Sequence, residues 1–244
     1  MTSTPDRFFI PRISTETRVV VGKDEARHMV RVLRMGVNDE LTAFDGSGAE
    51  CLCRIAEASA RRLVVEVLER RAVSREPAVD VTLAIAASKN KAMDMIVRKC
   101  TELGLSRLIP FQSGRSVARI DDASKIDKWR RAAVEACKQC GRNLLPEILE
   151  LHDLGGVLAA AAAYDLAVVA AENEQDVTLR QVLQRNAGAK TIMCVIGPEG
   201  GFEPAELAEI TRAGVAAVSL GRSILRVETA AVAALAMIIY QYSE

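Results

Sequence analysis

One seven-residue string, residues 196–202, has the residue types that point most directly to chemistry. It reads Ile196, Gly197, Pro198, Glu199, Gly200, Gly201, Phe202. The glycines and the proline force a turn that other residues cannot make, and they let a ligand touch the backbone. Glu199, with Glu203 and Glu206 just behind it, disfavours a phosphate and fits a neutral or cationic ligand. We therefore expect a ligand-binding loop, the alternative being an ordinary turn with acids at a helix N-terminus.

A second string, residues 220–230, also lies between an expected strand and an expected helix. Its candidate site residues are Leu220, Gly221, Ile224, Leu225, Arg226, Glu228 and Thr229. Apolar Ile224 and Leu225 in a loop are suited to wall a flat ring, while Arg226 and Glu228 form a possible neighbouring ion pair. Glu228 or Thr229 as a plain helix cap is the alternative. Two glycine-containing loops at strand ends are expected to converge on one pocket.

Charge is distributed unevenly along a chain whose formal net charge is zero. Residues 86–143 carry 13 basic and 6 acidic side chains, and residues 144–244 carry 6 basic and 13 acidic ones. This asymmetry predicts a basic face for a polyanion, against the alternative that Lys and Arg only solvate helix faces. The residues expected to contact phosphates are Arg7, Arg12, His28, Arg31, Arg34, Lys89, Lys91, Arg115 and Arg142.

The elements that position these residues change character near residue 73. Before it, short strands are expected at 40–44, 50–55 and 63–68, with one helix that Asp24 caps, which predicts a small barrel. Beyond a linker at 73–78, apolar strands alternate with helices. Strands are expected at 81–86, 107–111, 166–171, 191–196 and 217–220, and helices at 92–103, 124–141, 154–162, 177–183, 204–213 and 229–242. This alternation predicts a mostly parallel α/β sheet.

Several classes of protein are disfavoured by what the sequence lacks. It has neither the GxGxxG string of a dinucleotide-binding domain nor the GxxxxGK[ST] string of a P-loop. Cys137 and Cys140 have no second pair at a metal-binding spacing, so no metal site is expected. His28 and His152 have no nucleophile motif around them. The longest apolar run, 230–240, is about half of the ~20 residues that cross a bilayer, and no signal peptide is evident, so we expect a cytoplasmic protein with free thiols.

Taken together, the strings resemble the RsmE family of ribosomal RNA methyltransferases, of the SPOUT superfamily. The matching pieces are Arg7-Phe8-Phe9, His28 to Arg34, Lys99-x-Thr-Glu-Leu-Gly, Arg115-Ser116, Gln139-x-x-Arg142, the string at 197–202 and the string at 220–230. They occur in order over nearly the whole chain, and the last two are specific. Two positions depart from the family pattern, because Lys138 stands where Glu is common and Val227 where Thr is common.

The resemblance implies a PUA-like RNA-binding β-barrel over residues 1–72 and a SPOUT methyltransferase domain with a trefoil knot over residues 73–244. It also implies a homodimer and S-adenosylmethionine as methyl donor. The implied reaction is methylation at N3 of one uridine in 16S rRNA of the small ribosomal subunit. For the mechanism, we expect Arg226, or another arginine such as Arg142 or Arg7, to stabilise developing charge, and Glu199 and Glu228 are the two candidates for the base that removes the N3 proton.

Three other readings stay open from the sequence. The first is a SPOUT enzyme acting on another base or on a ribose 2′-hydroxyl. The second is a non-catalytic RNA-binding module, which gives no reason for two glycine loops. The third is an α/β enzyme for small molecules, which leaves the basic stretch unexplained.

Overall fold

The computed structural model of the chain describes residues 6–59, 62–88, 90–116 and 123–243. It contains two compact units. Unit 1 comprises Met1–Glu76 and Cys137–Leu145, and unit 2 comprises Pro77–Ala136 and Pro146–Glu244. The domain boundary that the sequence predicts between residues 72 and 73 stays a prediction. What a reading along the chain does not foresee is that a second, distant segment belongs to unit 1.

Unit 1 is built on a five-stranded mixed sheet in the order β1-β3-β4-β5-β2. Its strands are β1 (Arg7–Phe9), β2 (Arg18–Val20), β3 (Glu40–Phe44), β4 (Glu50–Ala58) and β5 (Leu63–Arg71). Alternate residues of β4, Cys51, Cys53 and Ile55, enter the core because successive side chains on a strand point to opposite faces. The three strands predicted from sequence are confirmed, and the two missed strands are only three residues long.

The single predicted helix of unit 1 is confirmed in place but differs in detail. It comprises α1 (Lys23–Arg27) followed by a π-helical turn, η1 (His28–Val32). Gly22, and not Asp24, is the N-cap, since the Gly22 carbonyl accepts the first helical hydrogen bond, from Ala26 N–H at 2.9 Å. The expected cap at Asp24 was therefore wrong. Its carboxylate lies one position inside the first turn, where it interacts favourably with the helix dipole.

Unit 2 contains the parallel sheet predicted from the apolar strands. The path of the sheet is β12-β10-β11-β6-β7-β8, with β9 also beside β7, and each of these pairs is parallel. The strands are β6 (Asp80–Ala86), β7 (Arg107–Gln112), β8 (Glu147–Ile148), β9 (His152–Asp153), β10 (Leu166–Ala170), β11 (Thr191–Ile196) and β12 (Ala216–Val218). The chain order jumps at β10 and β11, so the loops that follow β10, β11 and β12 meet at one edge.

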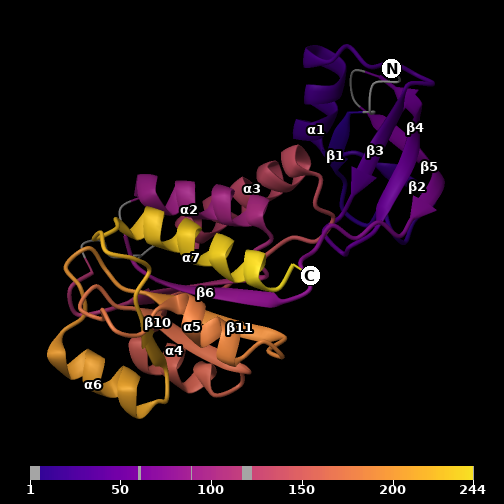
Figure 1. The fold of residues 1–244 in the computed structure, drawn as a ribbon. Helices are drawn as coiled ribbons and strands as arrows, with labels where there is room; N and C mark the ends of the chain where they lie inside the picture. The colour runs from indigo at the N-terminus through magenta and orange to yellow at the C-terminus, as the bar shows by residue number, and fades with distance from the viewer. Residues whose placement is uncertain (1–5, 60–61, 89, 117–122, 244) are drawn as a thin grey trace. The chain divides into compact units, whose positions relative to one another are not determined.

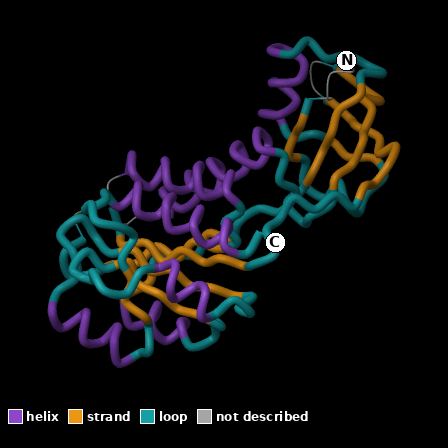
Figure 2. Tube along the Cα trace, viewed as in Figure 1, coloured by secondary structure: helices purple, strands orange, loops and turns teal. Residues whose placement is uncertain are grey.

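Helices cover both faces of this sheet and create two cores (Figures 1 and 2). Buried residues of α2 (Asn90–Leu103), α3 (Ala123–Cys140), α5 (Leu179–Arg185) and α7 (Val227–Gln241) share one core, and those of α4 (Leu154–Ala161) and α6 (Pro204–Arg212) share the other. Strand β6 contributes Leu83 and Ile85 to the first core and Ala84 and Ala86 to the second. Burial on both faces explains why the strand is a continuous apolar run.

The end of α2 and the start of α6 follow the sequence signals, whereas α2, α5 and α7 each start two residues away from the expected position. Gly104 ends α2 at φ +104°, as predicted, and Pro204 occupies the first turn of α6. Helix α7 begins two residues earlier than expected, with Arg226 as its N-cap. Glu228 and Thr229 are therefore inside the first turn rather than at the cap.

Candidate functional site

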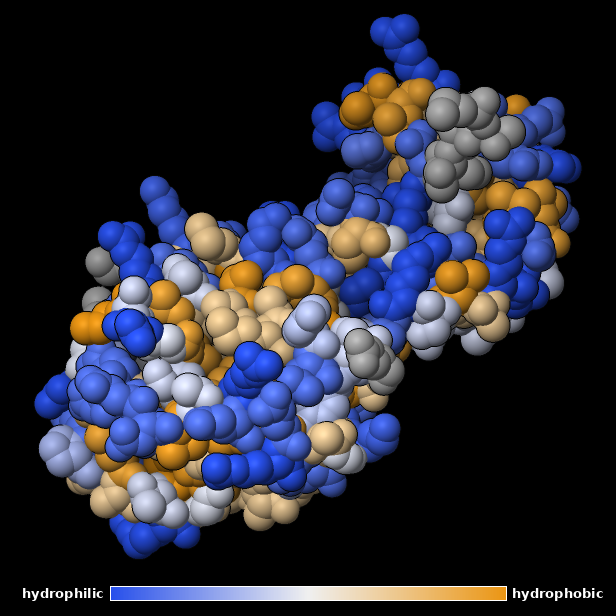
Figure 3. Space-filling model, in the orientation of Figure 1, coloured by the Kyte–Doolittle hydropathy of each residue, from blue (hydrophilic) through white to orange (hydrophobic). Residues whose placement is uncertain are grey.

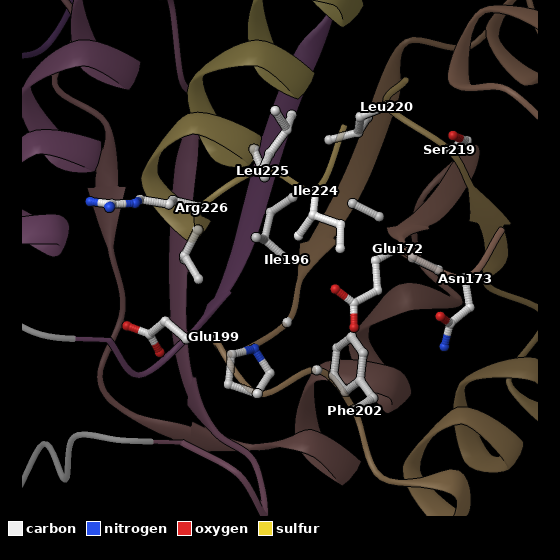
Figure 4. A pocket seen from close by; sticks show the side chains of 18 of the residues that line it. Glu172, Asn173, Ile196, Glu199, Phe202, Ser219, Leu220, Ile224, Leu225 and Arg226 are labelled. Carbon is white, nitrogen blue, oxygen red and sulfur yellow. The ribbon is translucent and has the colours of Figure 1, made fainter. Parts of the chain in front are cut away.

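Three loops at the carboxyl ends of adjacent strands enclose a cavity of about 380 Å³ in unit 2 (Figure 4). They follow β10, β11 and β12, which are neighbours in the sheet. The lining residues are Arg115, Ala170, Ala171, Glu172, Asn173, Ile196, Gly197, Pro198, Glu199, Gly200, Gly201, Phe202, Leu207, Ser219, Leu220, Gly221, Arg222, Ser223, Ile224, Leu225, Arg226, Val227 and Ala230. The convergence of the two glycine-containing loops on one pocket, expected from the sequence, is therefore observed.

The loop after β11 needs glycine for steric reasons. A Cβ on Gly197 would lie 2.7 Å from Cε2 of Phe202, closer than real contacts allow. The ring of Phe202 in turn stacks on Phe111, with centroids 6.5 Å apart and planes 5° from parallel. Gly201, at φ +68°, closes a turn by donating its N–H to the Pro198 carbonyl at 2.9 Å. The loop is thus folded tightly and its backbone is open to the cavity.

Contacts from the end of β7 fix this loop from outside. Arg115 donates through Nη1 to the Gly200 carbonyl at 3.1 Å, and its Nε lies 3.8 Å from a carboxylate oxygen of Glu203. The N–H of Gly114 donates to Glu206 at 2.8 Å. The acids behind the glycines therefore hold a neighbouring loop and cap α6, and they explain part of the acidic character that the sequence shows there.

The cavity has an apolar middle and charged sides. Ile196, Leu220 and Leu225 supply apolar walls, and Ile224 is 81% exposed at the rim. In Figure 4, Glu199 and Arg226 lie on one side of the pocket, and Glu172 and Asn173 lie on the other. One Glu199 oxygen accepts a 2.7 Å hydrogen bond from the hydroxyl of Ser88, at the end of β6. Such a cavity suits a ligand with a flat apolar part and a cationic part.

Most of the cofactor-site residues predicted from sequence line this cavity. Ile196, Gly197, Pro198, Gly200, Gly201, Leu220, Gly221, Ile224 and Leu225 all do, as do Glu199 and Arg226. Glu228 and Thr229 belong to α7 and do not line the cavity. Arg115, predicted as an RNA contact, lies at the cavity instead of on a separate basic face.

The predicted RNA contacts are in several different environments. Arg12, His28, Arg31 and Arg34 are exposed on unit 1, and Lys91 is exposed on unit 2. Lys89 lies outside the described residues. Arg142 is buried and the Arg7 side chain is only 12% exposed, so their assignment to RNA stays a prediction that their surroundings do not favour.

Arg7 and Arg142 belong to an ion-pair cluster inside unit 1. Arg7 pairs with Glu50 at 2.6 Å, donates to the Arg142 carbonyl and the Asn143 side chain, and lies 4.4 Å from the centroid of Phe44. Arg142, 3% exposed, pairs with Glu76, and Arg75 also reaches Glu50, at 3.1 Å. These contacts join the segment Cys137–Leu145 to the rest of unit 1.

Lys138 and Val227, the two residues that depart from the family pattern, both have defined surroundings in the structure. Lys138 pairs with Glu25 at 2.8 Å, and both side chains are largely buried. Val227 is the first residue of α7, is buried, and lines the cavity. The Lys at 138 is therefore balanced by an acid from α1, within unit 1.

Some cavity residues had no signal in the sequence. Ala170 is the last residue of β10, and Ala171, Glu172 and Asn173 follow it without a glycine or a recognisable string. Only the strand order reveals them, because β10 lies between β11 and β12. Ser88 was missed for the same reason.

Cysteine and metal chemistry has no support among the described residues. The six cysteines are free thiols, and the described part of the chain contains no cluster of three or more His, Cys, Asp or Glu side chains arranged for a metal. A hydrogen bond with Cys140 and burial raise the pKa of the Cys137 thiol far above its usual range. The Cys137 thiol also contacts the Leu144 carbonyl, at 3.6 Å. This packing role matches the expectation from sequence.

None of the described helices is both long enough and apolar enough to cross a bilayer.

Comparison with known proteins identifies the family. Residues 75–239 match the model of an RNA methyltransferase domain, and residues 21–68 match that of an RNA methyltransferase PUA domain. Ribosomal RNA small subunit methyltransferase E of Bacillus subtilis is 32% identical, over 89% of this chain and 88% of its own, and that of Mycobacterium bovis is 33% identical, over 88% and 84%.

A solved structure agrees in fold over the full length. Ribosomal RNA small subunit methyltransferase E from Neisseria gonorrhoeae, bound to S-adenosyl methionine, is 29% identical, with a TM-score of 0.88 over 98% of both chains. The matching domains, the parallel sheet and the loops at its edge lead to one conclusion: the chain belongs to the ribosomal RNA small subunit methyltransferase E family.

Proposed function

We propose that the protein transfers a methyl group from S-adenosylmethionine to N3 of one uridine in 16S rRNA, on the small ribosomal subunit in the cytoplasm. The observation that carries this proposal is the cavity that both family-specific strings enclose. The relatives' names and the cofactor in the Neisseria structure support the same reaction.

The residues present fit S-adenosylmethionine. Gly200 and Gly201 leave the backbone open, and Ile196, Leu220 and Leu225 form apolar walls suited to an adenine ring. Carboxylates of Glu172 and Glu199 suit the positive charges of the sulfonium and amino groups. When bound, this cofactor supplies an electrophilic methyl group.

Arg226 and Glu199 are the residues that we assign to the reacting base. They lie on the same side of the cavity (Figure 4), so a flipped base bound on that side would face both. The guanidinium of Arg226 would stabilise negative charge on a uracil carbonyl oxygen as the N3 proton leaves. Between the two candidate bases, we prefer Glu199, because Glu228 does not line the cavity.

The exposed basic residues fit contacts with RNA phosphates. Arg31 lies in η1 and Arg34 lies just after it. Both are exposed, as is His28. Lys91 at the start of α2 would add a contact from unit 2. Phosphate contacts of this kind give salt-dependent affinity without sequence preference.

We also propose that the chain forms a homodimer and that unit 2 carries the trefoil knot of SPOUT domains. Exposed apolar side chains support the dimer: Met95 on α2, and Met237 and Tyr240 on α7, which packs against α2. Figure 3 shows apolar residues gathered over α7. An apolar patch of this kind is typical of a protein interface.

The test is methyl transfer from labelled S-adenosylmethionine to small subunits that lack the modification, with mass spectrometric mapping of the product. A single N3-methyluridine supports the proposal. Label on another base or on a ribose would assign a different SPOUT target. Absence of transfer, together with no cofactor binding in calorimetry, would leave an RNA-binding module.

A further inference from the structure

The buried hydroxyl of Ser88 has no role in the function proposed above. Ser88 follows the end of β6 by two residues and is only 2% exposed. Its Oγ donates to Oε1 of Glu199 at 2.7 Å, across 111 positions of sequence. Serine hydroxyls commonly bond to nearby backbone groups. Because the Ser88 hydroxyl bonds instead to an exposed carboxylate, we infer that the orientation of this carboxylate matters.

The hydroxyl is held by a rigid element. Residues of β6 before it are buried on both faces, and the N–H of the adjoining Ala87 donates to the Phe111 carbonyl at 2.7 Å. Glu199, by contrast, is an exposed side chain at the tip of a turn. An exposed glutamate samples several rotamers, so one fixed partner restricts where its second oxygen lies.

The loop that carries Glu199 is restrained as well. Arg115 binds the next residue's carbonyl, at Gly200, and Phe202 closes over Gly197. The remaining freedom at this point is mainly in the Glu199 side chain, and Ser88 limits it. The contact therefore orients a carboxylate whose backbone is already fixed.

We propose that Ser88 is a positioning residue that holds Glu199 by one oxygen and leaves the other, Oε2, to accept the N3 proton of the substrate. This inference rests on the proposed function. Glu199 takes the proton as the nitrogen–carbon bond to the methyl group forms and the sulfur–carbon bond breaks, with the electron pair of that bond left on sulfur. The proton on Glu199 then passes to solvent.

The experiment is a double-mutant cycle with Ser88→Ala, Glu199→Gln and the combined variant. Single-turnover methyl transfer to unmodified small subunits is measured, and calorimetry gives the affinity for S-adenosylhomocysteine. We expect Glu199→Gln to slow transfer by about a hundredfold or more, as for loss of a general base. Ser88→Ala should slow it about tenfold to a hundredfold through misplacement of the carboxylate, with KM unchanged.

Two results separate positioning from a merely structural role. The combined variant should be no slower than Glu199→Gln alone, since Ser88 acts only through that carboxylate. Ser88→Thr, which keeps the hydroxyl, should recover most of the rate. Affinity for S-adenosylhomocysteine and the melting temperature should stay close to wild type in Ser88→Ala and Ser88→Thr, and Ser243→Ala, which removes an exposed hydroxyl, is the matched control.

Other outcomes overturn the inference. If the combined variant is slowed by the product of the two single-variant factors, Ser88 and Glu199 act independently. A Ser88→Ala enzyme with the full rate would remove the role altogether. A wild-type enzyme that methylates another nucleotide would refute the proposed function, while the cycle measured on that product would still report whether Ser88 acts through Glu199.

Discussion

Arg226 is the single residue whose loss should separate catalysis from cofactor binding. Its backbone caps α7, and in Figure 4 its side chain lies on the same side of the cavity as Glu199. We expect Arg226→Ala to lower turnover about a hundredfold to a thousandfold, as for loss of a group that stabilises transition-state charge. Calorimetry should show cofactor affinity near wild type. Unchanged turnover would rule out the role, and Arg212→Ala, an exposed arginine on α6, serves as control.

Gly197 should be intolerant of even one added methyl group. The Cβ of Gly197→Ala would collide with Phe202, whose ring cannot move without losing its stacking on Phe111. We expect a loss of about 1–3 kcal/mol in the free energy of unfolding and weaker cofactor binding. Gly188→Ala, where a Cβ meets open space, should leave both unchanged. Equal behaviour of the two variants in denaturant unfolding would contradict the steric argument.

At the residue scale, the sequence predicted those site residues whose backbone conformation only a few residue types can adopt. Glycines and proline leave a readable string because few other residues make such turns, so Gly197 to Gly201 could be found. Glu172, Asn173 and Ser88 could not. Their side chains are ordinary, and only the pairing of β10 and β6 with β11 brings them to the loop.

Two helix-ending glycines allow a test at the scale of elements. Gly104 after α2 and Gly214 after α6 both have positive φ, +104° and +76°. A Cβ on Gly104 would also lie 2.4 Å from Cγ of Pro77, whereas a Cβ on Gly214 would meet nothing. Gly214→Ala should therefore cost about 1 kcal/mol of stability, and Gly104→Ala about 2 kcal/mol more. If thermal unfolding shows similar losses of stability in the two variants, the Pro77 ring moves aside at little energetic cost.

Elements with a strong period were predictable, and short or irregular ones were not. Buried strands such as β6 and β11 are continuous apolar runs, and α2 and α3 have clear helical spacing. Strands β1 and β2 have three residues each, too few to show a period. The π-helical turn η1 has no distinguishing pattern, because its residues also suit an α-helix.

At the scale of the whole molecule, unit 1 should lose stability in acid through Glu50. Burial raises the pKa of this carboxyl, but hydrogen bonds and charges from Arg7 and Arg75 outweigh burial and hold it below its ordinary 4.5. A lowered pKa stabilises the fold above about pH 4.5, and that contribution is lost as pH falls through the folded value. Glu50→Gln should be less stable at pH 7 and lose less on acidification.

Denaturant unfolding between pH 7 and pH 3 measures this difference directly. Glu57→Gln is the control, because Glu57 is exposed and pairs with Arg18 at the surface, at 3.1 Å. Exposed pairs contribute little, so its pH profile should parallel wild type. Parallel profiles for Glu50→Gln would show that the cluster does not contribute to acid sensitivity.

The proposed dimer predicts a second whole-molecule result. Tyr240, 84% exposed on α7, should be buried against a second copy. Tyr240→Glu should weaken dimerisation by about 2 kcal/mol, close to thirtyfold in Kd, in sedimentation equilibrium. Val37→Glu, at an exposed position on unit 1, should not. A wild-type chain that sediments as a monomer at micromolar concentration would refute the dimer.

What a reading along the chain could not supply is long-range connection. The small β domain and the parallel α/β domain were predicted in order, because each has its own local period. The return of Cys137–Leu145 to unit 1 depends on Arg7, Glu50 and Glu76, residues with no shared motif. The trefoil knot that we propose for unit 2 would likewise leave no periodic signal in the sequence.

The return of that segment has a consequence for how the chain is made. A domain that ended at Glu76 could fold as soon as it left the ribosome, but unit 1 also needs residues up to Leu145. At about 5–20 residues per second, synthesis takes roughly 3 to 14 seconds longer to deliver them. During that interval Arg7 and Glu50 lack part of their cluster. The nascent N-terminal unit therefore lacks part of its native contacts until the chain is more than half translated.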